Sequence, residues 1–166
     1  MKAICIHWTA GPYAQTGADF EHYHFTVGKD GKVDAGKFKP EDNIPPLVSG
    51  KYAAHCGGGN SNVIGISLRG MAGYRNPEQV GLYPLTEKQC EAAWKKCAEL
   101  CHQYGIEVTE NTVYTHYEFG RKNPKTTSRG KIDINHLPYQ PNLGSLAVGD
   151  FIRNKVRWYL EKIQHA

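Results

Sequence analysis

The sequence has no long apolar run. None of its 166 residues begins a stretch that is apolar over the length needed to cross a bilayer. The apolar run at the N-terminus ends at His7, too early for a secretory signal. We therefore expect a protein that is not inserted in a membrane, is cytoplasmic as synthesised, and needs a partner for export.

The chain also lacks a strong charge of either sign. Its formal net charge is +4, a mild basic excess that does not predict nucleic acid binding but is compatible with an acidic polymer. A hydrophobic content of 40% and a charged content of 22% exclude disordered, collagen-like and coiled-coil proteins. A chain of this length normally forms one domain, so we expect residues 1–166 to form a single, monomeric domain.

Cysteine is present in an odd number, which does not suit a set of paired disulfides. Cys90, Cys97 and Cys101 recur at helical spacing, which predicts small buried side chains on one helix face. A zinc site built from these three thiols is the alternative, but no second pair of ligands lies nearby at zinc-finger spacing. We expect them to be packed in a core.

Periodicity predicts an α/β fold with a central mixed sheet flanked by helices. Short β-rich runs predict strands at 3–8, 23–27, 32–35, 63–68 and 112–116, the second and third joined by an Asp-Gly hairpin turn. A helix is predicted from the capping box of Thr86 and Gln89 to the stop signal at Gly105. A second, amphipathic helix is predicted over 148–163.

Two long segments are predicted to be loops. Residues 38–52 contain three prolines and are expected to have no regular structure. Residues 118–141 are basic and too long for a simple connection in a compact domain. Long loops of this kind often carry functional sites.

Two histidines stand at the carboxyl ends of predicted strands. His7 and His116 would converge at one edge of an α/β sheet, where such folds place their sites. Zinc in hydrolytic enzymes takes three protein ligands and leaves one position open, so a third donor is needed. Spacing alone leaves that donor undecided among Glu118, His55, Asp133 and His136.

Several short motifs form an ordered series along the chain. They are Ile6–Thr9, Tyr23–Phe25, Val27–Val33, His55 with 62–66, Thr115–Glu118 and 130–133. In this order they resemble the motifs of the zinc-dependent N-acetylmuramoyl-L-alanine amidases of type 2, a family that includes bacteriophage lysozyme-type amidases and animal peptidoglycan recognition proteins. The resemblance runs from Ile4 to about Leu137, and its specificity lies in the ordered set.

The resemblance implies a Zn²⁺ cofactor and a set of site residues. His7 and His116 match two zinc ligands, and the pattern of a lysine two residues before an Asp or Cys ligand selects Asp133 over His136. Matching positions further imply catalytic roles for Tyr23 and Lys131, and substrate contacts for His55 and Asn62.

The residue types suit this chemistry. Zinc on two neutral imidazoles and one carboxylate keeps a positive charge, lowers the pKa of a bound water to about 7 and polarises an amide carbonyl. A cation such as Lys131 or a phenol such as Tyr23 can stabilise the oxyanion that forms. Without the resemblance, Tyr23 would be interpreted as a core residue and Lys131 as a solvated loop residue.

The implied reaction is hydrolysis of the amide bond between N-acetylmuramic acid and L-alanine in peptidoglycan, at a zinc site in an open groove. The expected setting is a phage-type endolysin that degrades the cell wall after release. A cytosolic muropeptide-recycling amidase, a non-catalytic peptidoglycan-binding protein and a delivered toxin remain alternatives. The chain departs from the family at residues 11–22, too short for a full helix, and through an insertion at 121–129.

Overall fold

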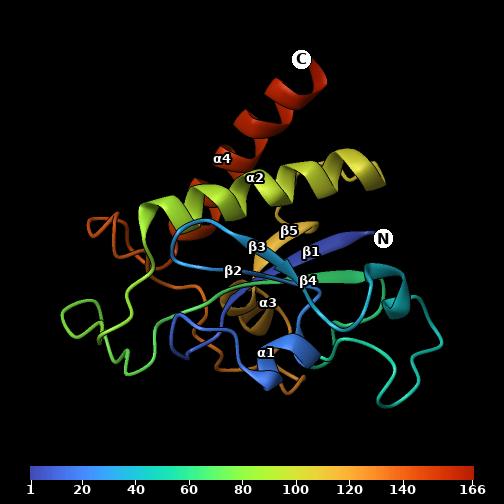
Figure 1. The fold of residues 1–166 in the computed structure, drawn as a ribbon, viewed down its shortest axis with the longest axis horizontal. Helices are drawn as coiled ribbons and strands as arrows, with labels where there is room; N and C mark the ends of the chain where they lie inside the picture. The colour runs from blue at the N-terminus through green and yellow to red at the C-terminus, as the bar shows by residue number, and fades with distance from the viewer.

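The computed structural model describes residues 1–166, which form layers around a five-stranded mixed sheet (Figure 1). The strand order is β3-β2-β4-β1-β5. The strands are β1 (Ala3–Trp8), β2 (Phe25–Val27), β3 (Val33–Ala35), β4 (Val63–Leu68) and β5 (Val113–Thr115). Neighbours pair in parallel except β3, which runs antiparallel to β2 across the predicted hairpin. The predicted fold class is confirmed.

Helices cover both faces of the sheet. The two long helices, α2 (Glu87–Tyr104) and α4 (Val148–Gln164), pack against each other over one face. The short helices α1 (Gly17–His22) and α3 (His116–Lys122) lie on the other side, and the C-terminus projects from the α2 and α4 side (Figure 1). No helix combines the length and the apolar composition of a membrane span.

Side chains of β1 alternate between two different environments. Ile4, Ile6 and Trp8 join the large apolar core under α2 and α4. Cys5 belongs instead to a small separate cluster on the opposite face, and His7 follows it on that face. The α2 and α4 side of the sheet is therefore a packed apolar core, and the other side carries buried polar groups.

Helix α2 has the ends that its sequence predicts. Thr86 and Gln89 form the capping box, and Gly105 ends the helix with a φ of 65°. The three cysteines of this helix are buried free thiols in the core, as expected from their spacing. Their face joins the helix to the sheet, so they serve packing.

Two of the predicted loops contain short helices. Residues 38–52 were expected to have no regular structure, but Pro40–Asn43 form a 3-10 helix with proline at its first turn. Likewise, the loop predicted from residue 118 begins only after α3, which ends at Lys122. The predicted strand 112–116 ends at Thr115 because that side chain caps α3 and forms a capping box with Glu118. The loop predictions are therefore wrong at 40–43 and 118–122, and the strand prediction is wrong at its two end residues.

Candidate active site

The carboxyl edge of the sheet brings His7 and His116 together. His7 is near the end of β1, and His116 follows β5 directly as the first residue of α3. Since β1 and β5 are parallel neighbours, both side chains reach the same edge, with ring centroids 4.7 Å apart. Asp133 reaches the pair from the loop after α3.

One carboxylate oxygen faces both imidazoles. Asp133 Oδ2 lies 2.9 Å from His7 Nδ1 and 3.4 Å from His116 Nδ1. The ligand atoms of the three residues all lie within 4.8 Å of one another, and all three residues are buried. Donors about 2.0–2.2 Å from a tetrahedral zinc stand about 3.3 Å apart, so this spacing and donor set fit zinc with one position left open.

The electrostatics of the cluster favour an ionised carboxylate. Burial raises the pKa of Asp133, but the hydrogen bonds to His116 and His7 outweigh it and leave the pKa below its usual value. Burial lowers the pKa of His7, and Asp133 offsets only part of this. For His116 burial also lowers the pKa, but Asp133 and Cys56 outweigh it and raise the pKa to about 9. The carboxylate therefore keeps a negative charge that a bound cation would neutralise.

The cluster opens into a groove of about 440 Å³. Its walls come from three segments, at residues 8–10, 71–74 and 130–133, with Tyr23, His55 and His116 beside them. The Tyr23 ring centroid is 5.2 Å from that of His7, and Lys131 is an exposed residue of the third wall. Burial, and then the charge of Asp133, raise the pKa of Tyr23, so its phenol stays protonated and can donate.

The two predicted substrate contacts lie in different places. His55 borders the groove but is only 7% exposed, and both of its ring nitrogens have partners within the protein. Asn62 precedes β4 at the amino edge of the sheet, with its backbone bonded to Lys2 and Asn43. The structure therefore brings His55 to the cluster and leaves Asn62 at the opposite edge.

Sequence reasoning missed two groups that hold the cluster. Ser128 is fully buried, and its Oγ lies 2.9 Å from His116 Nε2. Arg153 of α4 donates to both carboxylate oxygens of Glu118, at 2.9 Å each, and to the Val113 carbonyl. The capping motif at Thr115 could have indicated the role of Glu118; no local signal indicates Ser128.

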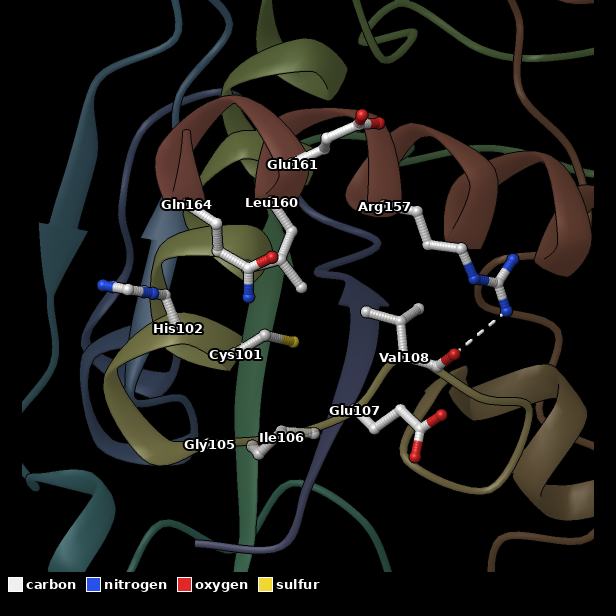
Figure 2. A pocket seen from close by; sticks show the side chains of 10 residues that line it. All are labelled: Cys101, His102, Gly105, Ile106, Glu107, Val108, Arg157, Leu160, Glu161 and Gln164. Atoms are coloured by element: carbon white, nitrogen blue, oxygen red, sulfur yellow. Dashed lines mark hydrogen bonds between the residues drawn. The ribbon is translucent and has the colours of Figure 1, made fainter. Parts of the chain in front are cut away.

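Another pocket, of about 530 Å³, lies on the opposite side of the sheet between the end of α2, residues 105–108 and α4 (Figure 2). Arg157 crosses its rim and donates to the Val108 carbonyl at 3.0 Å. Both groups of potential metal ligands in the structure include His7, and neither includes a residue of this pocket. The potential metal ligands therefore lie at the groove and not at this second pocket.

Two imidazoles and a carboxylate converging in a groove are typical of metal-dependent hydrolases. The chain belongs to the Amidase_2 family, described as N-acetylmuramoyl-L-alanine amidase, whose model matches residues 1–131. The family places the protein in the enzyme class of N-acetylmuramoyl-L-alanine amidases. Asp133 lies just beyond the matched residues, so the three-dimensional structure is what joins it to His7 and His116.

Solved structures share the fold. The N-acetylmuramoyl-L-alanine amidase LysC from Clostridium intestinale URNW aligns over 94% of this chain and 85% of its own, with 18% identity and a TM-score of 0.56. The endolysine N-acetylmuramoyl-L-alanine amidase LysCS from the same organism aligns over 94% of this chain and 83% of its own, with the same identity and TM-score. Among curated proteins, none matches the sequence.

Proposed function

We propose that this protein is a zinc-dependent amidase that hydrolyses the bond between N-acetylmuramic acid and L-alanine in peptidoglycan. The observation that carries the proposal is the convergence of His7 Nδ1, His116 Nδ1 and Asp133 Oδ2 at the groove. These three residues would hold the ion. Zinc would supply a Lewis acid for the amide carbonyl and lower the pKa of an attacking water.

Two groove residues are suited to stabilise the charge that develops on the amide oxygen. Tyr23 lies beside His7 and keeps its phenolic proton, so it can donate a hydrogen bond. Lys131 contributes a cation from the wall that leads into Asp133. We propose that both act as catalytic residues, with the groove walls holding the glycan and peptide on either side of the amide.

We further propose that residues 1–166 form one amidase domain and act as a phage-type endolysin. The helix α4 lies beyond the residues matched by the family model, yet it packs against α2 in the same core. The likeness to an endolysin amidase of similar length supports this setting. A recycling enzyme would instead prefer soluble muropeptides to the intact wall.

The test combines metal content with product analysis. Purified peptidoglycan sacculi and soluble muropeptides are incubated with the wild type and with His116→Ala, and new L-alanine amino termini are counted. We expect one zinc per chain, amine release from sacculi, and loss of both in His116→Ala. A matched control is His102→Ala, an exposed histidine on α2.

Three outcomes would contradict parts of the proposal. Sacculus binding without amine release, with zinc present, would indicate a recognition protein. Cleavage confined to soluble fragments would indicate a recycling amidase. Full activity in a zinc-free preparation would exclude the metal from the reaction.

A further inference from the structure

Both imidazoles of the cluster use both of their nitrogens. His7 points Nδ1 toward Asp133, while its Nε2 lies 3.0 Å from His55 Nδ1. The other nitrogen of His55, Nε2, lies 3.1 Å from the Val63 carbonyl oxygen. Three buried groups thus form a chain that starts on the backbone of β4 and ends at the cluster.

When the rings of His7 and His55 are both neutral, this series of hydrogen bonds has only one consistent arrangement of protons. A carbonyl oxygen can only accept, so His55 Nε2 carries the proton and donates to Val63. His55 Nδ1 is then an acceptor, so His7 Nε2 donates to it. The lone pair of His7 is then left on Nδ1, the atom that would bind the metal; without a metal, Nδ1 carries a proton and donates to Asp133 Oδ2 at 2.9 Å.

His116 is oriented in the same way by a different residue. The Ser128 hydroxyl donates to the Gly57 carbonyl at 2.7 Å, so its oxygen is left to accept from His116 Nε2 at 2.9 Å. The Nδ1 atom of His116 then faces Asp133. His55 and Ser128 thus leave the same atom, Nδ1, of both His7 and His116 to face Asp133.

We propose that His55 and Ser128 are positioning residues that fix which nitrogen each histidine presents to the metal. This inference rests on the proposed function, because it assumes that the cluster binds zinc. In this proposal His55 orients the metal ligand His7, instead of contacting the substrate as predicted from the sequence. Outer partners of this kind commonly tune metal affinity by about 10- to 100-fold.

The surrounding backbone is built to hold these two residues. A Cβ added at Gly65 of β4 would lie 2.5–2.8 Å from ring atoms of His55, so only glycine allows the imidazole to lie flat under the strand. Asn60 Oδ1 accepts from the backbone of His55 and Cys56 at 3.0 and 2.9 Å, fixing the loop that carries the ring. The Ser128 side chain is held against the same loop through Gly57.

The structure also contains a competing arrangement. Cys5, His7 and His55 form a second group whose ligand atoms lie within 4.8 Å of one another. If this group held a metal, His7 and His55 would each supply one ring nitrogen as a ligand. The hydrogen-bonded chain accounts for the 3.0 Å separation of His7 Nε2 and His55 Nδ1 without a metal, and the experiment separates the two.

The test measures zinc affinity directly, by competition with a fluorescent chelator and with no substrate present. His55→Leu keeps the volume and removes the acceptor, and Ser128→Ala removes one oxygen. We expect each to weaken zinc binding about 10- to 100-fold. His55→Asn, which returns an acceptor oxygen near the Nδ1 position, should recover most of the loss, and the exposed control His102→Leu should match the wild type.

Long-range ¹H–¹⁵N spectra provide a second readout. In the zinc-loaded wild type we expect protons on Nε2 of His7 and His116. In folded His55→Leu we expect a mixture of the two His7 nitrogens, which a purely structural role would not produce. Circular dichroism identifies variants that fail to fold. If His55→Leu fails to fold, the zinc affinity of Ser128→Ala provides the test.

Several results would overturn the inference. Unchanged zinc affinity in His55→Leu with a raised KM would return His55 to a substrate contact. A second zinc equivalent that disappears in Cys5→Ser would favour the competing site. Absence of zinc from the wild type would overturn this inference and the proposed function together, whereas tight zinc binding without amide cleavage would sink only the latter.

Discussion

Asp133 supplies one oxygen atom to two imidazoles, so its charge has no substitute in the cluster. Asp133→Asn preserves the shape but replaces the anion with an amide, and we expect zinc affinity and turnover to fall at least about 100-fold. Asp133→Cys supplies a thiolate, another good zinc ligand, and should retain the metal. Chelator competition and amine release measure both. Equal zinc affinity in Asp133→Asn would exclude Asp133 as a ligand.

Tyr23 differs from the proposed ligands because its contribution should be confined to the reaction. Tyr23→Phe removes one donor beside His7, and we expect turnover to fall about 100- to 1000-fold. Zinc affinity should stay unchanged. Tyr13→Phe is the matched control, since its phenol donates to the Pro84 carbonyl outside the groove. A fall in zinc affinity equal to the fall in turnover would show that Tyr23 supports the metal instead.

His24 makes the fold sensitive to acid. Burial lowers its pKa to about 4, although the hydrogen bond to Asn43 raises it in part. The unfolded chain has the higher pKa and takes up the proton first, so stability is present above pH of about 6.5 and is lost as the pH falls toward 4. One group with this shift accounts for about 3 kcal/mol.

We therefore expect urea denaturation to give a lower free energy of unfolding at pH 4.5 than at pH 7. His24→Asn keeps an acceptor for the Gly65 amide and does not titrate in this range, so its pH dependence should be shallower. A variant with the slope of the wild type would assign the acid sensitivity to other buried histidines.

The first turn of α3 depends on a contact with α4. Arg153 is buried, and its guanidinium is bonded to both oxygens of Glu118, which also accepts from the Thr115 amide. Arg153→Met leaves a partly buried carboxylate without its partner, and we expect unfolding free energy to drop by about 3–5 kcal/mol.

Chemical denaturation measures this loss, and zinc affinity should fall with it because His116 begins the same helix. The control is Lys122→Met, which breaks an exposed pair with Glu110 and should cost less than about 1 kcal/mol. Similar losses in the two variants would contradict a special role for the buried pair. The double variant Arg153→Met with Glu118→Gln should regain part of the loss.

Strands and helices could be predicted from the sequence where the apolar pattern extends over many residues or the capping motifs are complete. The strand at 63–68 and the helix ending at Gly105 match the structure because apolar spacing and caps agree there. Helices α1 and α3 were missed because six or seven residues are too few for apolar periodicity to register. Their capping boxes were the only signal.

The ordered set of motifs predicts His7, His116 and Asp133 as ligands, and the structure brings these three residues together. The positions of His55 and Asn62 could not be predicted, because a motif gives the order of residues and not the edge of the sheet or the depth at which they lie. His55 is buried in the space that Gly65 leaves, and Asn62 lies at the amino end of β4, away from the groove. Ser128 contacts His116 only because the loop after α3 turns back toward this histidine, and no sequence motif indicates that turn.

At the scale of the whole molecule, α4 completes the core although it lies beyond the residues matched by the family model. Val148, Ile152 and Val156 are buried under α2, and Arg153 ties the helix to α3. Deleting residues 148–166 should cost at least about 5 kcal/mol. We expect loss of the cooperative thermal transition. A truncated chain that melts near the wild-type temperature would show that 1–147 forms an autonomous domain.

One face of the sheet carries the apolar core under α2 and α4, and the groove lies on the other side. The chain ends on the side of α2 and α4 (Figure 1). A segment appended after Ala166 would therefore leave from the far side of the molecule. A carbohydrate-binding module, an affinity tag or a surface linker could be attached there without obstructing access to a bulky polymer. The C-terminus therefore offers a point for modular engineering that leaves the groove free.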